Sequence, residues 1–154
     1  MALNMPPPPL RSPRETLGGY VILPRLIDKI RLHARGKLPP EYIGQLLKPG
    51  LSLDGRFLTF TELDGKQLRG AILAVASDEE VLAIVARHSE LRTDDEKKWW
   101  ADDIAAYRPS AEGVALRQQL YPELAAQVDI GSLSAFDMID MDEGRIPIIK
   151  FGSQ

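Results

Sequence analysis

The segment between Arg11 and Arg31 carries the side chains best suited to bind an anion. Arg25 and Asp28 are three residues apart, as are Asp28 and Arg31, so on a helix they form neighbouring i, i+3 pairs. Arginine binds phosphate and carboxylate groups through two parallel hydrogen bonds, and a carboxylate among the arginines can orient them. The pattern predicts a basic helix face that binds an anionic small molecule. The candidate ligand-binding residues are Arg11, Arg14, Arg25, Asp28, Lys29 and Arg31.

The same charges also fit a structural interpretation. In that interpretation, Asp28 is the centre of a salt-bridge network that docks the N-terminal segment or pairs with the acidic part of the chain. The Gly18-Gly19 turn can fold Arg11 and Arg14 back onto the helix in both cases. The glycine pair is not a phosphate loop, because neither G-x-G-x-x-G nor G-x-x-x-x-G-K-[ST] occurs.

Charge is distributed unevenly along the 154 residues, whose net charge is −3. Residues 1–37 contain seven basic and two acidic side chains, whereas residues 76–144 contain six basic and sixteen acidic ones. This asymmetry predicts attraction within one molecule, or a homodimer in which the basic N-terminal face meets the acidic C-terminal face. A pI near 5.4 argues against a nucleic-acid partner.

The pair Trp99-Trp100 is a candidate contact with a partner. Adjacent helical residues point about 100° apart. Trp100 aligns with the apolar residues Ile104 and Tyr107 and is expected in the core, so Trp99 faces elsewhere. Trp99 can anchor a partner, since tryptophan is enriched in interface hot spots, or it can be partly buried against a neighbouring helix.

No catalytic residue, cofactor or metal site is predicted. The sequence has no cysteine, and its two histidines, His33 and His88, lack a metal-binding spacing. The acidic stretch before Gly144 is similar to part of an EF-hand loop, but Ile139 stands where the first ligand must be a carboxylate. No G-x-S-x-G nucleophile motif occurs.

The elements that position these residues are predicted to be helices. The clearest begins near Leu23 and ends at Gly36, with apolar residues at a 3.6-residue period. Ser77 and Thr93 each stand three residues before a glutamate, which predicts capping boxes at two further helix starts. A short helix is expected from Ser12 to the glycine pair, and Pro122 should kink or divide a later helix.

Residues 51–60 fit two structures. Asp54-Gly55 between apolar residues is typical of a hairpin, but Asp54 can also cap a helix over 55–60, which we favour because the flanks do not alternate. The fold expected is all-α, with about six or seven helices in one compact domain over 10–154. The proline-rich residues 1–9 are expected to be a disordered tail.

The location expected is the cytoplasm. No run of about 18 apolar residues is present, so no membrane-spanning helix is predicted. The first residues lack the apolar core of a secretory signal.

Several short motifs resemble a family catalogued as domain of unknown function 5069. The opening pattern is Leu10-Arg11-Ser12-Pro13, Leu17-Gly18-Gly19, Leu23-Pro24-Arg25 and Ile27-Asp28-Lys29-Ile30-Arg31. Weaker similarities follow at 36–39, 77–81 and 136–140, so the resemblance covers most of 10–145. It implies a soluble, mainly helical bacterial protein and transfers no catalytic residue. We therefore expect a small binding or interaction module; the alternative is a small enzyme or ligand-binding protein that recognises an anionic metabolite.

Overall fold

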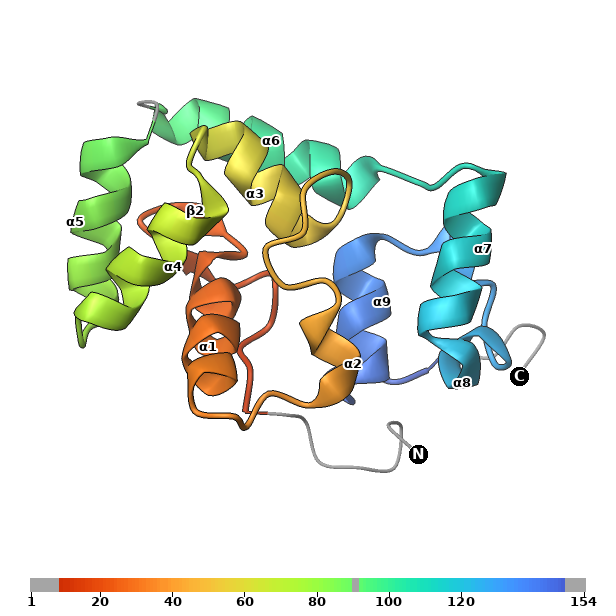
Figure 1. Cartoon of the computed structure of the whole chain (residues 1–154). Helices are drawn as coiled ribbons and strands as arrows, with labels where there is room; N and C mark the ends of the chain where they lie inside the picture. Colours follow the sequence, from red (N-terminus) through yellow and green to blue (C-terminus); the bar gives the residue numbers. More distant parts are fainter. Residues whose placement is uncertain (1–8, 90–91, 149–154) are drawn as a thin grey trace. The chain divides into compact units, whose positions relative to one another are not determined.

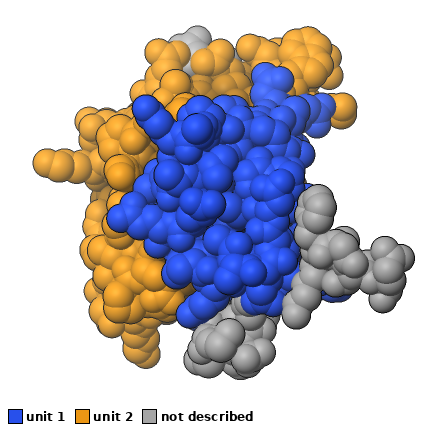
Figure 2. Space-filling view, turned by 90° about the vertical axis from the view of Figure 1, so that its right-hand side faces the viewer, with its two compact units in different colours: residues 1–9, 101–154 blue, residues 10–100 orange. Residues whose placement is uncertain are grey.

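The computed structural model describes residues 9–89 and 92–148 (Figure 1). The chain divides into two compact units, residues 10–100 and residues 1–9 with 101–154 (Figure 2). The expectation of one domain over 10–154 stays a prediction. The tail predicted to be disordered lies outside the described residues, except for Pro9.

Helices predominate in the described parts of the chain, which confirms the all-α fold class. The helices that lie in residues 10–100 or begin there are α1 Leu23–Ala34, α2 Pro40–Ile43, α3 Leu53–Thr61, α4 Gly65–Ala74, α5 Asp78–His88 and α6 Asp94–Ala106. The later elements are α7 Ala111–Leu120, α8 Pro122–Ala125, the 3₁₀ turn η2 Ile130–Ser132 and α9 Ala135–Asp142. These nine described α-helices exceed the expected number because α2 and α8 are single turns of four residues.

A small hairpin replaces the short helix that was predicted after Ser12. Strand β1 (Thr16–Leu17) pairs antiparallel with β2 (Tyr20–Val21). Gly18 and Gly19 both have positive φ, 58° and 84°, as a two-residue type I′ turn requires. The helix prediction is wrong beyond one turn at residues 12–15, because the glycine pair closes a hairpin instead of ending a helix.

Helix α1 is the central element of residues 10–100. Leu23, Leu26, Ile27 and Ile30 are buried, as the apolar period predicts. Gly36 follows with a φ of 70°, which confirms the predicted stop. One apolar face of helix α1 therefore packs into the core. Most of the remaining positions of the helix carry polar side chains.

Within residues 51–60, the part from residue 53 onward lies in helix α3, which confirms the favoured interpretation over the hairpin. The predicted cap is wrong, however, because Ser52 and not Asp54 accepts the hydrogen bond from the Gly55 amide, at 3.0 Å. The Asp54 side chain is buried and binds Lys29.

The other helix boundaries follow local signals. Ser77 and Glu80 form a complete capping box at α5, and Thr93 and Glu96 exchange the same two hydrogen bonds at α6. Pro122 divides the chain between α7 and α8, as expected.

The two tryptophans point in the predicted directions. Trp100 is half-buried and stacks on Phe60, with ring centroids 4.4 Å apart and planes 5° apart. Phe57 lies beside both Trp100 and Tyr20, so α3, α6 and the hairpin share one aromatic cluster. Trp99 remains 60% exposed.

Candidate functional site

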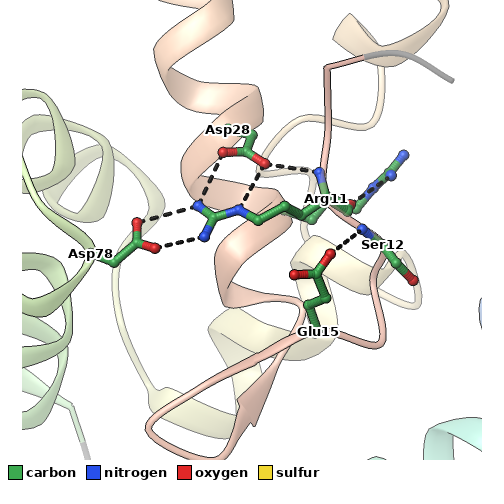
Figure 3. Close-up of polar contacts among 6 residues, drawn as sticks. Arg11, Ser12, Glu15, Asp28 and Asp78 are labelled. Atoms are coloured by element: carbon green, nitrogen blue, oxygen red, sulfur yellow. Dashed lines mark hydrogen bonds and ion pairs between the residues drawn. The ribbon is translucent and has the colours of Figure 1, made fainter.

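The charge network is centred on Arg11 and not on Asp28, where it was predicted. The Nε and NH2 atoms of Arg11 donate to the two oxygens of Asp28, each at 3.1 Å, and its backbone amide donates to the same carboxylate at 2.9 Å. Its NH1 and NH2 atoms also donate to Asp78, at 2.6 and 3.2 Å. Figure 3 shows the guanidinium between the two carboxylates. Arg11 therefore joins the N-terminal segment to α1 and to the start of α5.

Two arginines of α1 donate to backbone carbonyl groups. Arg25 is buried, donates to the Arg11 carbonyl oxygen at 3.2 Å and lies over the Tyr42 ring, 5.6 Å from its centroid. Arg31 donates to the Val75 carbonyl oxygen at 3.2 Å, just after α4. Both hydrogen bonds connect α1 to segments that are distant from it in the sequence.

The opposite charges of Arg11, Asp28 and Asp78 stabilise one another. Hydrogen bonding to Arg11 lowers the pKa of Asp78 below its ordinary value, although burial opposes the shift, and the charge of Arg31 lowers it further. The two carboxylates in turn raise the pKa of the Arg11 guanidinium. Because the pKa of Asp78 is lowered, its contribution to stability is present above the ordinary carboxyl pKa and is lost as the pH falls through the lowered value.

Lys29 forms a separate, buried ion pair. Its Nζ lies 2.7 Å from Oδ1 of Asp54, and the two side chains are 8% and 1% exposed. The second Asp54 oxygen accepts the Leu47 amide at 2.9 Å. The ion pair holds α3 against α1, and the Leu47 hydrogen bond holds the loop before α3 in the same place.

The six predicted residues are thus placed in different surroundings. Arg11 binds two carboxylates, Arg25 and Arg31 donate to carbonyl oxygens, and Lys29 is buried against Asp54. Arg14 lies exposed at the turn after Ser12. Their role as a ligand site stays a prediction.

Asp78 is the member of the network that sequence reasoning missed. The Ser77 capping box places Asp78 in the first turn of α5, but Arg11 is 67 residues away and no local pattern connects the two.

Carboxylates in α9 and at its C-terminal cap also have a structural partner. Arg145 forms ion pairs with Asp140 and Glu143, both of which are buried. Across residues 9–89 and 92–148, no group of three or more His, Asp or Glu side chains is placed to hold a metal ion.

Substituting Asp28 with asparagine should destabilise the fold by about 2 kcal/mol. The variant keeps the side-chain shape but removes the charge and one acceptor from Arg11, and hydrogen bonds to charged groups contribute about 1.5–3 kcal/mol. Urea unfolding of D28N measures the loss, with D103N as a control at an exposed carboxylate. A loss below about 0.5 kcal/mol, equal to that of D103N, would show that Asp28 is an ordinary surface residue.

Comparison with known proteins identifies a family. The model of the family described as domain of unknown function (DUF5069) matches residues 7–145. No curated protein matches the chain. None of the helices in the described residues is long and apolar enough to span a membrane.

Proposed function

The chain belongs to the DUF5069 family, and from this premise we propose that it is a binding module that docks a basic segment of a partner protein on helix α6. The observation that carries the proposal is the exposure of Trp99, 60% of whose surface is open to solvent. We place this interaction in the bacterial cytoplasm.

The surroundings of Trp99 indicate the chemistry of the partner. On helix α6, Asp95 lies one turn before Trp99, and Asp103 lies one turn after it. Both carboxylates are exposed. An indole flanked by carboxylates fits a lysine or arginine side chain, which can lie over the ring while its charge faces an aspartate. The segment of the partner should therefore carry basic and aliphatic residues together.

The alternative function, recognition of an anionic metabolite on α1, has less support. An anion that uses Arg11 must displace Asp28 or Asp78, which already occupy its guanidinium. The contact between Arg11 and Asp78 likewise supports attraction between the basic and acidic segments inside one chain. A homodimer through the basic N-terminal and acidic C-terminal faces is one of the outcomes that the experiment below tests.

The proposal is tested by titrating the protein with a basic amphipathic peptide of lysine, arginine and leucine. We expect the Trp99 indole resonance to shift, and W99A to weaken binding at least about tenfold, as is typical of an interface hot spot. L51A is the matched control, because Leu51 is an exposed apolar residue outside α6.

Three results would contradict the proposal. Binding could be equal in W99A and L51A, or a peptide with glutamate at the basic positions could bind as tightly. The protein alone could also form a dimer that W99A dissociates, in which case the occupant of this face is a second copy of the chain.

A further inference from the structure

A buried arginine on helix α7 has no carboxylate partner. Arg117 is 8% exposed, and its NH1 atom donates to the carbonyl oxygens of Ile130 and Leu133, both at 2.8 Å. Within residues 9–89 and 92–148, no carboxylate lies within 4.0 Å of its guanidinium. Buried charges in proteins are ordinarily paired, because burial without a counter-charge is costly. Arg145 in the same unit follows that rule, since it binds two carboxylates.

The opposite edge of the Arg117 guanidinium is open. No described residue accepts a hydrogen bond from Nε or NH2. Of the described residues, only Ser89 has a side-chain polar atom that is both buried and without a partner, so the free edge of Arg117 reaches solvent. This edge presents two parallel donors, which is the geometry that binds two oxygens of one anion.

A second arginine converges on the same turn. Arg108 donates from Nε to the Ser132 carbonyl oxygen at 2.9 Å, next to the Leu133 carbonyl that Arg117 binds. Its NH1 atom binds the carbonyl oxygens of Ala105 and Tyr107, whereas its NH2 atom has no acceptor in the described chain. Both guanidinium groups are therefore held by backbone groups around η2, and each keeps free donors.

The electrostatic interaction between Arg117 and Arg108 agrees with the arrangement of their free donors. Burial lowers the pKa of Arg117, and the nearby charge of Arg108 lowers it further. The phenol groups of Tyr107 and Tyr121 oppose the shift. Two positive charges close together without a carboxylate favour an added anion.

We propose that Arg117 and Arg108 form a binding site for a phosphate group, supplied by free phosphate or by a small phosphomonoester. The dianion balances the two charges, and its oxygens accept from the Arg117 edge and from NH2 of Arg108. The carbonyl contacts hold both side chains in place before the ligand arrives, which reduces the entropy lost on binding. The site does not depend on the docking role of α6.

The test uses the full chain with inorganic phosphate, methyl phosphate and acetate, each compared with sodium chloride at equal ionic strength. We expect phosphate to raise the melting temperature above its value in chloride and to shift the side-chain Nε resonance of Arg117. R108Q should weaken phosphate binding at least about tenfold, because it removes one charge and one donor. R87Q is the matched control, since Arg87 is exposed on α5.

R117K keeps the charge but removes the paired donors, so it should lose phosphate binding. If R117K fails to fold, the comparison of R108Q with R87Q still decides the question. Equal effects of phosphate and chloride would overturn the proposal, as would equal phosphate affinity in R108Q and R87Q. Acetate binding as tightly as phosphate would overturn the assignment to phosphate. Methyl phosphate binding as well as inorganic phosphate identifies a site for phosphomonoesters, whereas a preference for inorganic phosphate identifies one for the free ion.

Discussion

Replacing Asp54 with alanine is expected to destabilise the protein by about 3–5 kcal/mol, because it removes one member of a buried ion pair, the carboxylate that binds the ammonium group of Lys29. Asp54 is 1% exposed and accepts hydrogen bonds from Lys29 Nζ and from the Leu47 amide. The substitution therefore removes the counter-charge of one group and the acceptor of another. Urea unfolding followed by circular dichroism measures the change.

A double-mutant cycle separates this ion pair from simple loss of volume. K29M should also destabilise the protein, but K29M/D54L should lose less than the two single variants together, since the double variant removes both charges of the ion pair. K66M provides the control, because Lys66 is exposed on α4. Additive losses in K29M and D54L would show that the two side chains stabilise the fold independently.

Replacing Gly55 with alanine should destabilise the protein by about 3 kcal/mol, although alanine is the better helix former. A Cβ at position 55 would lie 2.5 Å from the Gly50 carbonyl oxygen and 2.6 Å from the Lys48 carbonyl oxygen. These are backbone atoms, so the loop before α3 must move to make room, and overpacking of this kind costs about 1–3 kcal/mol.

Gly70 gives the matched comparison for Gly55. It lies within α4, and nothing is within 4 Å of the position that a Cβ would take. G70A should stabilise the protein by about 0.5–1 kcal/mol through helix propensity alone. Thermal and urea unfolding of both variants should therefore give changes of opposite sign. A stabilising G55A would mean that the close approach of the loop to α3 does not exist in solution.

The sequence alone determined the features that depend on neighbours in the chain. The capping box at Ser77, the division at Pro122 and the apolar period of α1 were all predicted, and the structure confirms each one. These signals work locally, because a cap or a helical stripe involves residues within about one turn of each other. The different directions of Trp99 and Trp100 follow from the same helical geometry.

The turn at Gly18-Gly19 shows where local signals are ambiguous. A glycine with positive φ can end a helix or form the turn of a hairpin, and the sequence does not separate the two. Asp54-Gly55 has the same ambiguity, and there the favoured helix was right although its cap was wrong. The predicted cap failed because Asp54 has a stronger partner in Lys29, 25 residues earlier.

Only the tertiary structure decided which charges meet. Arg11 pairs with Asp78 across 67 residues, and Arg117 and Arg108 converge on one turn well beyond both of them in sequence. The charge distribution predicts that basic and acidic segments attract, but attraction between charges has no period and no fixed spacing along the chain. Packing of the helices selects the partners, because a carboxylate stabilises an arginine only when the fold brings the two within hydrogen-bonding distance.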